Sequence, residues 1–507
     1  MRSRTERNLL SLLLLSIFST AATAQEESFD FSNLSISNQF EYAIEKETAD
    51  EIVEDWFRLD YQTEVLSFGA RYETFQPSEK SAFLDPDDIG YVPPHTTFEG
   101  FTFRYLEFQR DGIQVTAGNF YDLFGRGIAF RSYENRDVRI DNSLDGIRVK
   151  VRRGIFDGTY MTGKMLEKDV SGISQERKGL LHAANFEARL SDRFRLAPLE
   201  HLLLGTSFVR QELPVSLDPQ ASLRREIATG RMEAGISGAY LYGEYGERLS
   251  GPGSALYLGS NLDFHGLGLS LEYKRYDRFA LRTANNQVDY NNPPALSREH
   301  TFTLLSRNAW VMNVNDEKGY QVEATYSPLR ENTLIFNFSH TTDLEGNLEF
   351  EEFYGEWSRS QGEWLYMVLA YGSQTNVGIR SLIPILELQF FLDERNSIRT
   401  ELQHQHEKAT FLGEFDVDLL VAEYSRSPRW TFSFIGERNN MSDLQRELQQ
   451  LPDKDIFVGG LASIHLSDSH DLMAFFGSRQ KGKVCVGGVC RTEPEFEGFE
   501  VKLFSKF

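Results

Sequence analysis

Hydrophobic and polar residues alternate along most of this chain. Leu386 and Leu388, for example, flank Glu387, and the alternation continues on both sides of them. A period of two predicts a β-strand, because successive side chains leave opposite faces of the pleat. Candidate strands of this kind follow one another at nearly even spacing, from Asn33–Ile44 to Phe496–Phe507.

Helical patterns are nearly absent from the series. One short amphipathic helix is expected around Asp443–Gln450, whereas His300–Leu305 is predicted as a strand. Beyond the N-terminus no apolar run approaches the roughly 18 residues that a membrane-spanning helix needs. No Pro/Gly-rich linker divides the chain, so one domain at 25–507 is expected.

So many alternating strands in one open sheet would leave long exposed edges. Closing the sheet removes the edges, and a bilayer requires closure because it cannot hydrate unpaired backbone groups. Short turns alternate with long polar links, which is typical of an outer-membrane barrel. The predicted fold is therefore all-β: a single transmembrane antiparallel β-barrel of roughly 22–26 strands, without a plug domain.

The two ends of the chain suggest export and membrane insertion. Residues 1–24 combine three arginines, an apolar core and an Ala22-Thr23-Ala24 cleavage site, the pattern of a signal peptide. The last strand alternates and ends in Phe507, which we interpret as the signal read by the barrel-insertion machinery. Bacterial outer membrane is the expected location, with lipid and lipopolysaccharide as surroundings, and a homo-oligomer is possible.

Charge identifies one unusual region. The chain carries a net charge of −22, yet the window 126–153 holds eight basic and four acidic residues, a local balance of +4. The predicted pore-lining cations in this region are Arg148, Lys150, Arg152, Arg126, Arg131, Arg136 and Arg139. A ladder of cations raises the local anion concentration. The alternative is that the first three pair with acids of neighbouring strands, and that the last four lie on a loop folded into the pore or bind lipopolysaccharide phosphates.

Other residues carry weaker signals. The aromatic residues Phe120, Tyr121, Phe124 and Phe130 suggest girdle or loop packing rather than a ligand path. Cys485 and Cys490 are expected to form a disulfide, since an exported chain oxidises a close pair and no further ligands suggest a metal. Barrels start and end in the periplasm, so this loop and the link Asp122–Ser143 are expected on the extracellular side.

The sequence does not indicate an enzyme active site. The histidines are scattered, and His404 and His406 share a strand face with Leu402, so no nucleophile, base and orienting group can be assembled. Nucleotide and zinc motifs are absent, so neither catalysis, a cofactor, a metal nor nucleic-acid binding is expected. Strand alternation starts near Asn33, which leaves no room for the plug of an energy-coupled receptor.

Two stretches carry a resemblance to a known family. They are NFYDLFGRGIAFRSYENRDVRIDNSLDGIRVKV and VCVGGVCRTEPEFEGFEVKLFSKF. The chain resembles a group of bacterial outer-membrane barrels of Bacteroidota known mainly as a domain of unknown function. It is loosely similar to porins and alginate-export-type barrels, which implies a pore with a cationic lining. The expected function is passive passage of small or oligomeric, possibly anionic, solutes; a scaffold or export conduit for a protein or polysaccharide is the alternative.

Overall fold

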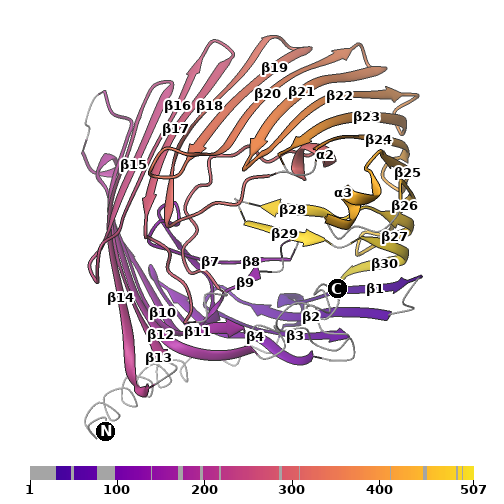
Figure 1. The fold of residues 1–507 in the computed structure, drawn as a ribbon. Coiled ribbons are helices and arrows are strands. Elements are labelled where there is room, and N and C mark those ends of the chain that lie inside the picture. The colour runs from indigo at the N-terminus through magenta and orange to yellow at the C-terminus, as the bar shows by residue number, and fades with distance from the viewer. Residues whose placement is uncertain are drawn as a thin grey trace, which may run out of the picture.

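The computed structural model shows a closed antiparallel β-barrel of 24 strands (Figure 1). It describes residues 30–46, 51–76, 98–136, 138, 140–168, 175–194, 198–215, 218–284, 288–307, 309–410, 413–448, 454–486, 489–493 and 495–507. The first wall strands are β1 (Leu34–Glu45), β2 (Glu51–Gln62), β3 (Leu66–Gln76), β4 (Phe98–Arg110), β5 (Ile113–Phe120), β10 (Leu144–Arg153), β11 (Phe156–Lys168), β12 (Gln175–Arg189), β13 (His201–Val215), β14 (Asp218–Ile236), β15 (Ala239–Arg248) and β16 (Ser254–Phe264). The others are β17 (Leu267–Asp277), β18 (Asp316–Leu329), β19 (Asn332–Thr342), β20 (Leu348–Gln361), β21 (Leu365–Asn376), β22 (Ile379–Phe391), β23 (Asn396–Ala409), β24 (Gly413–Arg426), β25 (Trp430–Asn439), β26 (Ile456–Ser467), β27 (His470–Arg479) and β30 (Phe496–Lys506).

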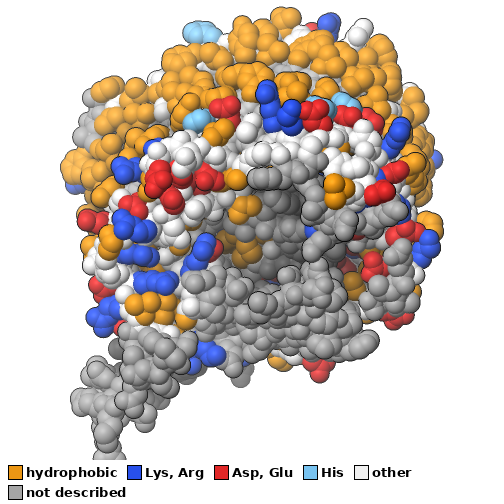
Figure 2. All heavy atoms as spheres, viewed as in Figure 1, with side chains coloured by type: hydrophobic (Ala, Val, Ile, Leu, Met, Phe, Trp, Pro, Cys, Tyr) orange, Lys and Arg blue, Asp and Glu red, His pale blue; other side chains and the backbone are white. Residues whose placement is uncertain are grey.

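Alternation along each strand separates an apolar outer face from a polar inner face. On β19, Leu334 and Phe336 are 44% and 39% exposed, whereas Asn337 and Ser339 are fully buried. Hydrophobic side chains accordingly cover the outer rim of the barrel in Figure 2. An apolar belt outside a closed sheet is the arrangement that a bilayer requires of a spanning structure. The protein is therefore an outer-membrane β-barrel, as the sequence predicts.

The first and last strands close the barrel. β1 pairs with β30 in antiparallel register from Ser37 opposite Lys506 to Glu45 opposite Gly498. The terminal residue extends this pairing, because the Phe507 amide donates to the Ile36 carbonyl over 2.8 Å. No backbone edge is left between the two ends of the sheet.

The connections differ in length at the two ends of the barrel. Turns of two residues, such as 237–238 and 265–266, are typical of one end. The opposite end carries the long links 77–97, 121–143, 278–315, 440–455 and 480–495. Short turns are periplasmic and long loops extracellular in bacterial barrels, so an outward-facing long-link end stays a prediction. The link Asp122–Ser143 and the Cys485–Cys490 hairpin both belong to that end.

Several long links fold back inside the wall instead of projecting from it (Figure 1). Their short elements are β6 (Asp122–Phe124), β7 (Phe130–Ser132), β8 (Glu134–Asn135), β9 (Ile140–Asp141), α2 (Thr303–Ser306), α3 (Asp443–Leu448), β28 (Gly482–Val486) and β29 (Val489–Glu493). Two single 3-10 turns, η1 (Phe31–Asn33) and η2 (Leu190–Asp192), lie outside these links. The predicted range of roughly 22–26 strands includes the observed 24.

The predicted elements are correct along the wall and differ inside it. The helix expected around Asp443–Gln450 is confirmed as α3. The strand predicted at His300–Leu305 is wrong, because Thr303–Ser306 forms a helical turn whose Leu304 and Leu305 are both buried. An isolated apolar run does not distinguish a short strand from a buried helical turn. The signal-peptide prediction for residues 1–24 and the predicted site residue Arg139 lie outside the described residues.

Candidate functional site

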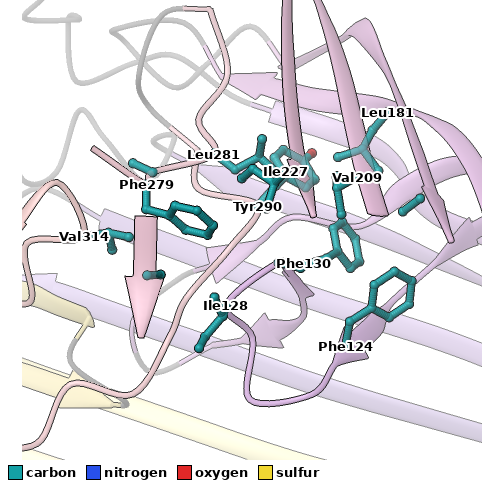
Figure 3. Close-up of a cluster of buried hydrophobic side chains, with 14 of the residues drawn as sticks. Phe124, Ile128, Phe130, Leu181, Val209, Ile227, Phe279, Leu281, Tyr290 and Val314 are labelled. Carbon is teal, nitrogen blue, oxygen red and sulfur yellow. The ribbon is translucent and has the colours of Figure 1, made fainter. Parts of the chain in front are cut away.

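The lumen is partly filled by two links that pack against the inner wall. In link 121–143, Phe124, Ile128 and Phe130 are buried, and in link 278–315 so are Phe279 and Tyr290. They form one apolar cluster with wall residues such as Leu181, Val209 and Ile227 of β12, β13 and β14 (Figure 3). Burial of this much apolar surface fixes the links to one side of the barrel. We call the described residues of 278–315 the strap.

Hydrogen bonds join the two links to each other. The Asn291 side chain donates to the Ile128 carbonyl over 3.0 Å, and the Asn292 amide donates to the Gly127 carbonyl over 3.1 Å. A Cβ on Gly127 would lie 2.6 Å from the Asn292 carbonyl oxygen, and Gly127 has a φ of +82°. Only glycine satisfies both this close approach and this backbone conformation.

The strap leaves β17 over a buried ion pair. Lys274 and Glu317 face each other across β17 and β18 and are almost completely inaccessible to solvent. Lys274 also donates to the Ala295 carbonyl of the strap, and Glu317 accepts from the indole nitrogen of Trp310 over 3.1 Å. A buried ion pair is tolerated only when its remaining hydrogen-bond donors and acceptors have partners, and the strap supplies those partners.

The α2 turn of the strap docks on β21 and β23. The Leu304 amide donates to the Gln403 side chain over 2.9 Å, and the Gln374 side chain donates to the Leu305 carbonyl over 3.1 Å. Gly372 leaves the space that Leu305 occupies, since a Cβ at this position would lie 2.3 Å from the Leu305 Cδ2. Small and amide side chains on the wall thus form the seat for this turn.

Three basic side chains of the strap contact wall glutamates. Arg298 pairs with Glu323 of β18. His300 Nε2 lies 2.9 Å from an oxygen of Glu352 on β20. The strap therefore meets successive carboxylates as it crosses the lumen. It reaches β25, where Arg307 forms two 2.6 Å hydrogen bonds to the carboxylate of Glu437.

Link 121–143 is anchored by a separate charge cluster. Arg71 of β3 is 2% exposed and contacts Glu73 at 2.5 Å, Glu134 at 2.6 Å and Asp141. Burial disfavours the charged form of Asp141, but the charge of Arg71 and the backbone amide of Ser143 outweigh it and hold the pKa of Asp141 below its usual range. This cluster joins β8 and β9 to the wall.

The predicted wall cations lie on the inner face and contact acids. Arg148 bonds the Tyr121 carbonyl at 2.7 Å and lies 3.2 Å from Glu107. Lys150 lies 2.9 Å from Asp122, and Arg152 lies 2.8 Å from Asp157. These contacts favour the alternative in which the cations pair with neighbouring acids. A role in anion selectivity stays a prediction.

The predicted cations of link 121–143 lie inside the barrel. Arg126 covers the Tyr242 ring at 5.1 Å from its centroid, and Arg131 covers the Tyr133 ring at 4.5 Å. Arg136 pairs with Glu134 at 2.8 Å. The sequence left two alternatives for these residues: a loop folded into the pore, or binding of lipopolysaccharide phosphates. The positions of Arg126, Arg131 and Arg136 fit the first. The aromatic residues Phe120, Phe124 and Phe130 join the buried cluster, as expected for loop packing.

A cavity of about 710 Å³ lies between the strap and the β1–β30 side of the wall. Trp56, Phe457, Phe475 and Phe496 contribute aromatic surface to its lining. Its charged lining residues are Glu41, Glu45, Glu54, Glu437, Glu495, Glu500, Arg136, Arg307, Arg479 and Lys502.

Charges in this cavity are largely paired. Arg479 lies 2.6 Å from Glu500, and Lys502 lies 3.0 Å from Glu41. Arg479 also covers the Phe496 ring at 4.8 Å. Alternating ion pairs and aromatic rings give the cavity a polar, wettable surface. Among the described residues, no group of His, Cys, Asp and Glu side chains is arranged to hold a metal ion.

The remaining positions from the sequence are two outward-facing histidines and the cysteine pair of the folded-in β28–β29 hairpin (Figure 1). His404 and His406 face outward and contact Asp418 and Asp416, each at 2.8 Å. Cys485 and Cys490 stand opposite each other in the β28–β29 register, while their side chains lie outside the described residues. The disulfide stays a prediction.

Sequence reasoning did not find the strap, and its glutamate partners were not singled out. Glu323, Glu352 and Glu437 occupy inward positions of strands that were predicted correctly. Their alternation with apolar outward residues was a signal for an acidic inner wall. The basic residues of 298–307 gave no signal, since nothing in their spacing shows which strands they meet.

Comparison with protein families assigns this chain. The family model described as "Family of unknown function (DUF6029)" matches residues 6–507. The chain belongs to the DUF6029 family. This match confirms the resemblance to a domain of unknown function, here over nearly the whole chain. Among curated proteins, no sequence matches this DUF6029 protein.

Solved structures of similar shape are large barrels of about this length. The translocation pore of the P pilus usher PapC aligns at 10% identity over 93% of this chain and 99% of the usher chain, with a TM-score of 0.45. The siderophore receptor PirA from Pseudomonas aeruginosa aligns at 11% identity over 94% of this chain and 80% of the receptor, with a TM-score of 0.46.

Proposed function

We propose that this DUF6029 protein is an outer-membrane channel for passive passage of small or oligomeric solutes. The observation that carries the proposal is the cavity of about 710 Å³ inside the barrel, lined by charged and aromatic side chains. A barrel that served only as a membrane scaffold would have no need of a polar cavity inside its wall. Closed barrels of this size enclose water-accessible lumens unless they are filled by side chains or loops.

The strap restricts the proposed route to one side of the lumen. Link 121–143 and the strap bury the inner face of β10–β17 in an apolar cluster. The cavity borders β1, β2, β24–β27 and β30 instead, beside Thr303 and Arg307 of the strap. The proposed route passes there, and its width depends on the position of the strap. The proposal does not depend on an anion preference.

Swelling of liposomes that contain the purified protein tests the proposal. Sugars of increasing size should enter and cause swelling at rates that fall with solute size. Ala43 lies on the inward face of β1 and lines the cavity, so Ala43→Trp should slow the swelling. Ala462→Trp is the matched control, because Ala462 of β26 pairs with the outward Phe432 and its indole would meet lipid.

Two results would contradict the proposal. If liposomes with correctly folded protein swell no faster than empty ones, the barrel does not pass solutes and the export-conduit alternative gains support. If Ala43→Trp and Ala462→Trp behave alike and like the native protein, the cavity is not on the route.

A further inference from the structure

Charge divides the inner wall into two arcs. On β18–β25, the described inward side chains include nine glutamates and one arginine, which we call the acidic arc. The glutamates are Glu317, Glu323, Glu352, Glu356, Glu387, Glu401, Glu407, Glu423 and Glu437, and the arginine is Arg399. On β10–β15, the described inward side chains include eight cations and four carboxylates, the basic arc.

The cations of the basic arc all have partners among the described residues. Each of its eight cations contacts a carboxylate or a carbonyl in the described structure. Arg231 pairs with Glu187, Arg189 pairs with Asp157, and Arg148, Lys150 and Arg152 have the acidic partners given above. The other three donate to backbone carbonyls of the folded-in links: Arg177 to Ser143, Arg225 to Arg282, and Arg248 to Ala280. Arg152, Arg189 and Arg231 thus pair within the wall, and the other five cations hold the links in place.

The acidic arc holds two carboxylates without a close ion pair, although Glu423 stands opposite Arg399 in the β23–β24 register. Glu356 accepts a hydrogen bond from the Tyr354 hydroxyl over 2.6 Å. Glu423 accepts from the hydroxyl of Ser433 over 2.9 Å and from Ser425 over 3.4 Å. Within the described part of the chain, neither carboxylate has a basic nitrogen within 4.0 Å, and both side chains are only partly buried. Hydroxyl donors leave the full negative charge on a carboxylate.

The strap shows that this arc binds basic side chains. Its Arg298, His300 and Arg307 come from a separate segment, and each is seated on a glutamate of the acidic arc. A guanidinium group is thus already recognised by Glu437 with paired hydrogen bonds. Glu356 and Glu423 lie further from the long-link end than Glu352, and the lining of the cavity includes neither of them. They face the part of the lumen that follows the cavity toward the short-turn end, and within the described residues neither forms an ion pair with the strap.

We propose that Glu356 and Glu423 make the passage selective for cations, with amines and guanidinium compounds as the favoured organic solutes. This inference rests on the proposed function, since it concerns the charge of what passes. Carboxylates that line a narrow pore raise the local cation concentration and oppose anions. The basic residues of β10 then stabilise the folded-in links, and the selectivity comes from the opposite wall.

Reversal potentials across planar bilayers under a potassium chloride gradient test the inference. The native protein should show a potassium-to-chloride permeability ratio above one. Glu356→Gln with Glu423→Gln, which keeps the shape and the hydroxyl contacts, should lower that ratio roughly twofold or more, as expected for the loss of close charges in water. Glu351→Gln is the matched control: Glu351 adjoins Glu352 on β20 but faces outward beside His340, so the ratio should stay native.

The outcomes separate this inference from the proposed function. Conductance with a ratio at or below one in the native protein, or an unchanged ratio in the double variant, would overturn the cation filter and leave the channel intact. If correctly folded native protein gives no conductance, the channel itself is refuted and the filter with it.

Discussion

Arg307 and Glu437 join the strap to the wall of the cavity. Both guanidinium nitrogens lie 2.6 Å from the carboxylate oxygens, and the two side chains are 15% and 6% exposed. The pair connects a loop that enters from the long-link end with β25, on the far side of the lumen from β17. Because Arg307 also lines the cavity, the same contact fixes the strap and bounds the proposed route.

Removing Arg307 should loosen the strap and widen the route. Arg307→Ala leaves Glu437 buried without its cation, and breaking a buried pair on one side costs about 3–5 kcal/mol. We expect a larger single-channel conductance and faster cleavage at strap arginines by trypsin. The double variant Arg307→Ala, Glu437→Ala removes the uncompensated charge, so it should be more stable than the single variant. Equal conductance in native protein and Arg307→Ala would show that the strap does not limit the route.

Gly372 offers a second way to displace the strap, through shape instead of charge. Gly372→Val places a side chain where Leu305 packs, and such overpacking costs about 1–3 kcal/mol. Single-channel conductance should rise, and Leu305→Ala in the same protein should restore the native value by making room.

The neighbouring strand supplies the control for this substitution. Gly355 of β20 pairs with Tyr371 and faces outward, where a Cβ would meet only Phe353 at 3.9 Å. Gly355→Val should therefore leave conductance unchanged. A larger conductance in both valine variants would show that β-propensity or membrane packing, rather than the strap, causes the change.

Acidification should weaken the anchor of link 121–143. The charge of Arg71 outweighs burial and lowers the pKa of Asp141, so the folded pKa lies below the unfolded value. The stability that this carboxylate contributes is present above its unfolded pKa and is lost as pH falls through the folded pKa. Melting temperatures of detergent-solubilised native protein and Asp141→Asn should therefore differ near pH 7, and the difference should shrink as the pH falls below the ordinary carboxyl pKa range of about 4. A constant difference across that range would contradict this assignment.

The cations of β10 should affect stability more than selectivity. Arg148 and Lys150 share Asp122, which lies at the start of the folded-in link. Arg148→Gln with Lys150→Gln should lower the melting temperature and leave the reversal potential close to native. A shift of the reversal potential toward cations without a loss of stability would instead support the anion preference predicted from the sequence.

The Cys485–Cys490 disulfide is testable by alkylation. The two residues are direct partners in the β28–β29 register. Denatured protein prepared without reductant should resist iodoacetamide at both positions, and reduction should make both reactive. Cys485→Ser should leave Cys490 reactive without reduction. Labelling of both cysteines in unreduced native protein would contradict the disulfide.

The strands of the barrel wall were predictable from the sequence, whereas the packing of the links inside the lumen was not. Alternation such as that of Leu334 and Phe336 with Asn337 and Ser339 is a local signal, because a strand exposes its two faces regardless of which strand lies beside it. Burial of Leu304 and Leu305 depends instead on Gly372, Gln374 and Gln403, which are distant in the chain. Contacts of that kind are set by closure of the barrel.

The charge of the lumen shows the same limit. The local excess of cations at 126–153 was visible in the sequence, but their partners Glu107 and Asp157 lie on β4 and β11, and Arg71 holds the link from β3. A count of charges along the chain therefore identified cations that form ion pairs with acids elsewhere in the fold. The carboxylates Glu356 and Glu423 carry no local signature, since the absence of a close ion pair at either one, within the described residues, follows from the folded structure.

Single-channel recording in planar bilayers tests the central claim most directly. The purified protein should produce discrete conductance steps in potassium chloride, and Gly372→Val should produce larger ones. Absence of steps from correctly folded protein, in both the native form and Gly372→Val, would contradict the account of this barrel as a solute channel narrowed by its own strap.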